Sequence, residues 1–109
     1  MHLPFHNYAG PGTHVIQRLL QHKAPTTILD KAALIHDIDY MNPNITKEQA
    51  DDTMYENLKK YNKLLASLVR TALFVGNKLG VKNGDMEKYK YARDLAISSG
   101  YIDSQMSFT

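Results

Sequence analysis

Cysteine is absent from this chain of 109 residues. Its absence excludes the disulfide bridges that brace many small secreted enzymes, and it also excludes a thiolate metal site and a thiol nucleophile. No stretch approaches the roughly 20 apolar residues of a membrane span, and the first residues lack the basic flank and apolar run of a secretory signal. We therefore expect a chain without signal peptide or transmembrane segment that is stabilised by packing.

Charge of one sign is not in large excess. Thirteen Lys and Arg stand against eleven Asp and Glu, which gives a net charge of +2. This is too little to predict nucleic-acid binding, and we expect none. Seven acids and only two bases lie between Asp30 and Glu56, whereas the rest of the chain holds eleven bases and four acids. Such an acidic middle could hold a cation, although solvated helix faces would produce the same pattern.

Apolar spacing and turn residues predict one all-α domain over residues 1–109. We expect an arm and loop at 1–12, a short helix and linker at 13–29, a pair of consecutive antiparallel helices at 30–61, supporting helices at 62–99 and a polar tail at 100–109. Asp30 is the expected N-cap of the first paired helix, and Asp85 that of the last helix. Thr46 and Gln49 have the spacing of a capping box for the second paired helix.

Apolar residues between Leu64 and Leu79 recur at helical spacing. The predicted stripe comprises Leu65, Leu68, Val69, Ala72, Val75 and Leu79. We expect this stripe to be core rather than membrane-inserting, because a small domain needs that apolar area to fold.

Three polar residues of the first paired helix lie on one face. At 100° per residue, Asp37 and Tyr40 both fall within about 100° of His36. Asp51 or Asp52 on the next helix is the candidate partner carboxylate for the histidine. Asp51 has apolar neighbours one and two turns on and is expected to point inward, with Asp52 pointing to water. A carboxylate that accepts the ring N–H would raise the basicity of the other nitrogen, as a general base requires.

Glycines near the amino terminus supply a second component. Gly10 and Gly12 flank Pro11 and let the backbone curl tightly. Carbonyl oxygens turned toward a common point can hold Ca²⁺, which is commonly completed by a carboxylate, and Asp37 is the natural side-chain ligand.

Two motifs carry a resemblance to a known family. "YAGPG" at 8–12 and "LDKAALIHDIDY" at 29–40 resemble the Y-x-G-x-G calcium loop and the H-D-x-x-Y helix of phospholipase A2. The proline within the loop is most similar to the cysteine-free phospholipase A2 domains of parvovirus capsid proteins. The resemblance implies a phospholipase A2-like core without disulfides, with two antiparallel active-site helices, a calcium loop and accessory helices.

The resemblance also implies roles for individual residues. The backbone oxygens of Tyr8, Gly10 and Gly12 and the carboxylate of Asp37 would bind Ca²⁺. His36 would deprotonate the attacking water, Asp51 would orient His36, and Tyr40 would hydrogen-bond to Asp51. The implied reaction is hydrolysis of the sn-2 ester of a glycerophospholipid.

The implied partner is a phospholipid membrane surface, bound peripherally, with a viral capsid protein as a second candidate. The implied location is cytoplasmic or virion-associated. We expect the rim of the cleft, including Leu3, Phe5, Pro11 and Leu19 or Leu20, to meet lipid. Two other functions stay open at this stage: an inactive lipid-binding or capsid-associated module, and a metal-dependent phosphohydrolase of the HD type.

Overall fold

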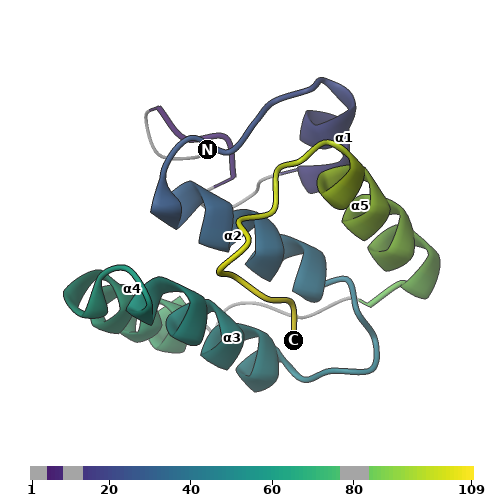
Figure 1. Cartoon of the computed structure of the whole chain (residues 1–109). Coiled ribbons are helices and arrows are strands. Elements are labelled where there is room, and N and C mark those ends of the chain that lie inside the picture. Colours follow the sequence, from purple (N-terminus) through teal and green to yellow (C-terminus); the bar gives the residue numbers. More distant parts are fainter. Residues whose placement is uncertain (1–4, 9–13, 77–83) are drawn as a thin grey trace.

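The computed structural model describes residues 5–8, 14–76 and 84–109. Within these ranges the helices are α1 (Val15–Leu20), α2 (Ile28–Asp39), α3 (Lys47–Lys59), α4 (Lys63–Gly76) and α5 (Met86–Ser98). None of the described residues forms a strand, so the predicted all-α fold class is confirmed. Figure 1 shows α2 in the centre, with α3 and α4 on one side and α1 and α5 on the other.

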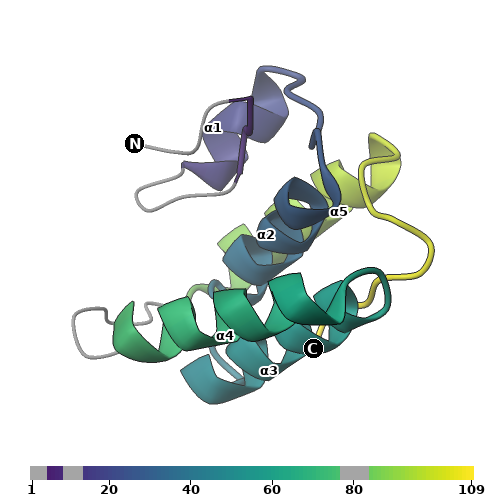
Figure 2. The same ribbon diagram turned by 90° about the vertical axis from the view of Figure 1, so that its left-hand side faces the viewer.

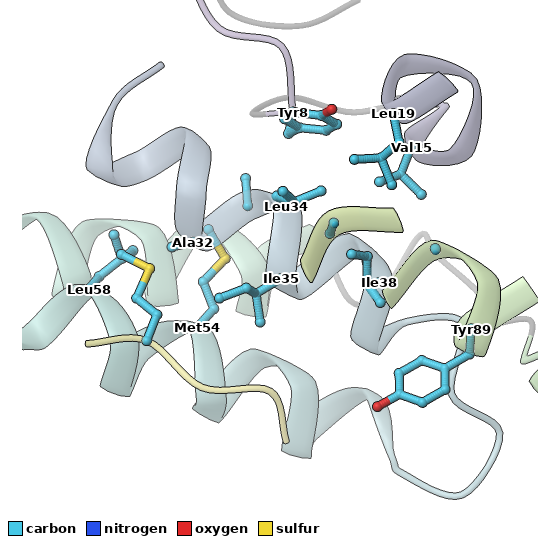
Figure 3. Close-up of a cluster of buried hydrophobic side chains, with 14 of the residues drawn as sticks. Tyr8, Val15, Leu19, Ala32, Leu34, Ile35, Ile38, Met54, Leu58 and Tyr89 are labelled. Atoms are coloured by element: carbon cyan, nitrogen blue, oxygen red, sulfur yellow. The ribbon is translucent and has the colours of Figure 1, made fainter. Parts of the chain in front are cut away.

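The central helix α2 is buried around most of its circumference. Leu34, Ile35 and Ile38 are each 0% exposed. They point in different directions from the helix axis, because successive residues advance by about 100°. Figure 3 shows Met54 of α3 on one side of α2, and Tyr8 with Leu19 of α1 on another. These contacts fix α2 within the molecule, and with it the side chains that it carries.

The start of α2 differs from the prediction. Thr27 is the N-cap, and its hydroxyl accepts a hydrogen bond from the backbone N–H of Asp30 at 3.1 Å. Asp30 lies inside the first turn and is 0% exposed. Its carboxylate accepts the backbone N–H groups of Tyr8 at 2.6 Å and Thr26 at 2.9 Å. The prediction that Asp30 caps the helix was therefore wrong, since this carboxylate binds the amino-terminal segment instead.

The second helix of the pair begins as predicted. Thr46 accepts the N–H of Gln49, and the side chain of Gln49 accepts the N–H of Thr46, which completes the capping box. The turn before it is closed by Asn42, whose side-chain oxygen accepts the N–H of Asn44 at 2.9 Å. Figure 1 shows α2 and α3 running in opposite directions as a result.

Helix α4 packs against α3 alone among the described helices, and Figures 1 and 2 both show it at the periphery. Only Ala66 is buried, whereas Leu68 is 61% and Val75 is 62% exposed. The predicted core stripe was therefore wrong for Leu68, Val75 and Ala72, which is also exposed. Leu65 and Val69 are half-buried against the core, and Leu79 lies outside the described residues. Each exposed large apolar side chain forgoes about 1.5–3 kcal/mol of burial free energy.

The carboxyl-terminal part returns across the helix pair. Asp85 caps α5 by accepting the N–H groups of Glu87 and Lys88, as predicted. After α5 the chain turns at Gly100, where φ is +73°. The C-terminal segment, residues 101–109, then passes from the end of α5 to α2 and α3 (Figure 2).

Side-chain hydrogen bonds hold this segment against both helices. Asn57 of α3 donates to the carbonyl of Ser107 and accepts its N–H, both at 2.9 Å. The N–H and the hydroxyl of Thr109 donate to Asp39 of α2, the hydroxyl at 2.9 Å. The segment thereby joins the two helices, which carry no covalent link because the chain has no cysteine.

Candidate active site

His36 and Asp51 meet where α2 faces α3. His36 Nε2 lies 2.7 Å from Asp51 Oδ1, and both residues are buried, at 8% and 7% exposure. Asp52, in contrast, is exposed and accepts a hydrogen bond from Arg70 at 2.9 Å. Of the two candidate carboxylates left open by the sequence, Asp51 is the one that contacts the histidine.

Tyr40 lies one helical turn after His36 and completes this contact. Its hydroxyl donates to Asp51 Oδ1 at 3.1 Å, and its ring centroid lies 4.4 Å from that of His36. Burial, followed by the negative charge of Asp51, raises the pKa of Tyr40 above its ordinary value. The phenol is therefore a proton donor to Asp51 at any physiological pH.

Asp37 stands on the other side of the imidazole. Its Oδ1 lies 3.8 Å from His36 Nδ1, while its Oδ2 is buried and has no hydrogen-bond partner. Burial raises the pKa of Asp37 to about 6, against the opposing effect of His36. An ionised carboxylate oxygen buried in this way is costly unless a cation or another partner neutralises it.

The protonation of His36 depends on both carboxylates. Burial works to lower the pKa of His36, but Asp37 and Asp51 outweigh it and raise the pKa to about 9. The imidazole has one carboxylate near each ring nitrogen, at 2.7 Å and 3.8 Å. A proton taken up by the ring is therefore stabilised on either side.

The unpartnered oxygen of Asp37 fits the predicted calcium ligand. Ca²⁺ prefers carboxylate and carbonyl oxygens, and this carboxylate is held rigidly on a buried helix. Burial is the largest cause that raises the pKa of Tyr8, and the negative charge of Asp37 adds to this rise. The Tyr8 hydroxyl donates to the carbonyl of Lys23 at 2.5 Å, which fixes the first residue of the predicted loop. Gly10 and Gly12 lie outside the described residues.

Side chains alone do not form a metal centre in the ranges that the structure describes. No group of three or more His, Asp or Glu residues there has the geometry to hold an ion. A calcium site built on Asp37 would consequently depend on backbone oxygens for most of its ligands, as the sequence predicted.

A cleft opens beside the site, with a volume of about 560 Å³. One wall is formed by Asp37 of α2 with Tyr40 and Met41, which directly follow this helix, and the others by residues 14–17 around α1 and Lys88 of α5. Lys88 and Gln17 were not predicted as part of the site, because no local pattern in the sequence indicates that α1 and α5 pack side by side. His36 lies directly behind this wall, next to Asp37 in the chain and packed against Tyr40.

Two further residues that were not predicted support the two active-site helices. Asp39 and Asn57 are 0% and 2% exposed, and both bind the C-terminal segment. A signal was present: each is a polar residue within the apolar face of its helix, where a hydrogen-bond partner is required.

Searches of curated proteins and of solved structures returned no match to the chain. A family model described as the phospholipase A2-like domain matches residues 1–75. The matched region includes α1 to α3, almost all of α4 and every predicted site residue, and it ends before α5 and the C-terminal segment. Because the match spans well over half of the chain, the protein belongs to the phospholipase A2-like domain family.

Proposed function

We propose that this protein is a calcium-dependent phospholipase A2 that hydrolyses the sn-2 ester of glycerophospholipids. The observation that carries the proposal is the 2.7 Å contact between His36 and Asp51 on facing helices, with the unpartnered oxygen of Asp37 beside the same ring. A general base must be held in one tautomer with its second nitrogen directed toward the substrate. The contact to Asp51 meets the first condition.

The proposed reaction uses a water molecule without an acyl-enzyme. Asp51 accepts the Nε2–H of His36, which leaves Nδ1 of the neutral ring as the proton acceptor. In the metal-free protein Asp37 and Asp51 raise the pKa of His36 to about 9, so the ring must lose a proton before it can act. Calcium bound by Asp37 would favour that loss, because it would neutralise one of the two carboxylates. His36 removes a proton from water as the water oxygen bonds to the ester carbonyl carbon. The tetrahedral intermediate then collapses: the bond to the sn-2 glycerol oxygen breaks, and that oxygen takes the proton from the imidazolium. The products are a lysophospholipid and a free fatty acid.

Asp37 and the backbone oxygens of Tyr8, Gly10 and Gly12 would hold the metal. Bound Ca²⁺ would supply Lewis-acid polarisation of the ester carbonyl. Tyr40 positions Asp51 rather than touching substrate, because its hydroxyl is directed at the carboxylate.

The proposed partner is the surface of a phospholipid membrane, bound peripherally. No helix among the described residues has the length and apolar character needed to cross a bilayer. The resemblance to viral phospholipase A2 domains supports a role in breaching a host membrane, with a viral capsid protein as the companion and a cytoplasmic or virion-associated location.

The test uses phospholipid vesicles labelled in the sn-2 chain. The full chain is incubated with calcium, with a chelator, and as His36→Gln. We expect release of the labelled chain only for the unsubstituted protein with calcium. Release that persists in chelator or in His36→Gln would refute the proposal, and vesicle binding without release would identify an inactive lipid-binding module.

A further inference from the structure

Positive charge is concentrated in one stretch of the sequence. Between Glu56 and Asp85 there are six Lys or Arg residues and no Asp or Glu, although the whole chain has a net charge of only +2. The remaining residues therefore hold seven bases against eleven acids. Helix α4 is the described helix within this stretch, and Lys63 and Arg70 are its only charged residues.

The same helix exposes more large apolar side chains than any other described element. Leu64, Leu68, Phe74 and Val75 are 71%, 61%, 68% and 62% exposed. Positions 64, 68 and 75 fall within about 40° of one another around the helix axis, so they form one outward stripe, with Phe74 at its edge. The opposite face, which includes Ala66, packs against α3.

We propose that the outer face of α4 docks on the surface of an anionic phospholipid bilayer. The proposal rests on the proposed function, which requires such a surface, and it assigns the face that meets it. An amphipathic helix with leucines outward, bases at its margin and no acid suits the boundary between acyl chains and anionic headgroups.

The basic residues lie at suitable places for this contact. Lys63 begins the helix, and Lys59 and Lys60 precede it. The ammonium of Lys60 donates to the carbonyl of Gln105 at 2.6 Å and that of Lys59 lies 5.8 Å from the ring centroid of Tyr55, so Lys63 is the main basic residue for this contact. Arg70 is held over the ring of Tyr55, 4.5 Å from its centroid, and pairs with Asp52, so it contributes less to a lipid contact. The N-terminal end of α4 is therefore its most cationic part. Long lysine side chains there can keep the ammonium group at headgroup level while their stems contact the apolar layer.

As a lipid-contacting surface, the outer face of α4 is better supported by the structure than part of the cleft rim that the sequence predicted. Leu19 is 1% exposed and packs in the core, so it does not meet lipid. Phe5 and Leu20 are 93% and 52% exposed, whereas Leu3 and Pro11 of the predicted rim lie outside the described residues. An extended apolar patch is more informative than single exposed side chains, which are common on protein surfaces.

The test measures binding separately from turnover. The full chain carrying His36→Gln, with chelator present, is sedimented with vesicles of phosphatidylcholine alone or mixed with phosphatidylglycerol. We expect preference for the anionic vesicles and a loss of about tenfold or more in partitioning for the variant with Leu64→Ser and Leu68→Ser. Ile97→Ser is the matched control, because Ile97 is 51% exposed on α5. Its partitioning should equal that of the parent.

A second variant, Lys63→Glu, reports on charge without removing apolar area. It should weaken binding to anionic vesicles and leave binding to phosphatidylcholine unchanged. Unfolding midpoints in urea are compared for all variants, since these positions are exposed and their substitution should preserve folding. The two proposals can fail separately. If the leucine substitutions abolish vesicle binding but the protein that retains His36 releases no sn-2 chain, the docking face is supported and only the catalytic proposal is refuted.

Three results would overturn the docking proposal. The first is full binding by the double leucine variant, and the second is an equal loss for Ile97→Ser. In the third, no variant binds vesicles, and the parent protein self-associates in a way that the leucine substitutions abolish. This result would assign the α4 face to a second copy of this chain.

Discussion

At the scale of single residues, the two nitrogens of His36 have different surroundings. Nε2 is in hydrogen-bond contact with Asp51, whereas Nδ1 faces Asp37 at 3.8 Å, beyond a direct hydrogen bond. The first contact fixes the orientation of the ring. The second leaves Nδ1 without a direct hydrogen bond to Asp37.

Neighbouring acids on α3 allow a matched pair of substitutions. Asp51→Asn should lower kcat by about 10²-fold or more, because an amide can donate its own N–H to His36 and favour the wrong tautomer. Asp52→Asn should keep kcat within about twofold, since Asp52 is exposed and paired only with Arg70 at the surface. Initial rates of sn-2 chain release over a range of lipid concentrations measure both. Equal losses would show that Asp51 has no particular role.

The pKa of His36 predicts a pH dependence of stability in the metal-free protein. Because the pKa of about 9 in the folded protein is above the ordinary histidine pKa of 6.5, the stabilisation from protonated His36 is complete below pH 6.5. It is lost as the pH rises through 9, and the upper limit of this loss is roughly 3 kcal/mol. Urea unfolding with chelator at pH 6 and above pH 9 should show a smaller change for His36→Gln than for the parent. An identical change in both proteins would contradict the assigned pKa.

At the scale of elements, the C-terminal segment supports the active-site helices from outside the region that matches the family. Its contacts reach α3 through Asn57 and α2 through Asp39. Lys60 and Tyr61 add hydrogen bonds to Gln105 and Asp103, both at 2.6 Å. Each contact limits movement of one helix relative to the other, and thus of Asp51 relative to His36.

Removal of the buried amide of Asn57 should loosen this segment. Asn57→Ala leaves the backbone N–H and C=O of Ser107 without their partner, and we expect a loss of about 1–3 kcal/mol in the free energy of unfolding. Gln105→Ala is the control, because the exposed Gln105 contributes its backbone carbonyl to the contact with Lys60. Urea unfolding measures the loss, and hydrogen exchange of residues 101–109 locates it. Unchanged exchange in Asn57→Ala would show that the segment is held by other contacts.

The sequence predicted the start of a helix correctly where the capping hydrogen bonds join residues that are close in the chain. The capping box at Thr46 and the N-cap at Asp85 each involve residues within four positions of one another, and both are present. Asp30 was misassigned because its partners Asn7 and Tyr8 lie 23 and 22 residues away. A helix-capping pattern cannot reveal a carboxylate that binds a distant segment.

The outward stripe of α4 shows a second limit of sequence reasoning. Helical periodicity identifies apolar residues that share a face, but it does not reveal whether another element covers that face. Leu64 and Leu68 remain exposed because α4 contacts α3 alone among the described helices. For the candidate site the periodicity was more informative, since it placed His36, Asp37 and Tyr40 together and favoured Asp51 over Asp52. Lys88 could not be found, because its place at the cleft depends on the packing of α5.

At the scale of the whole molecule, the acidic site and the basic stretch lie in different parts of the fold. The carboxylate of Asp51 is buried between α2 and α3, and that of Asp37 lines the cleft beside α2, whereas α4 is peripheral (Figure 2). An anionic surface could therefore attract the outside of the protein without displacing a cation from the site.

This charge distribution predicts a salt dependence for membrane association. Partitioning onto anionic vesicles should weaken severalfold between low salt and 0.5 M salt, because the Debye length falls from about 10 Å at 0.1 M toward 3 Å at 1 M. Partitioning onto phosphatidylcholine, which depends on apolar contact, should change little. Vesicle sedimentation across a salt series measures both, and equal salt dependence on the two surfaces would argue against an electrostatic contribution.

Hydrogen bonds of the C-terminal segment, rather than disulfides, hold the active-site helices together, so the fold does not depend on oxidising conditions. Asn57, Asp39 and their partners join α2 to α3 through groups that neither glutathione nor dithiothreitol can cleave. The spacing between His36 and Asp51 is thus independent of redox potential, and the same geometry is available in a reducing cytosol and in an oxidising vesicle lumen.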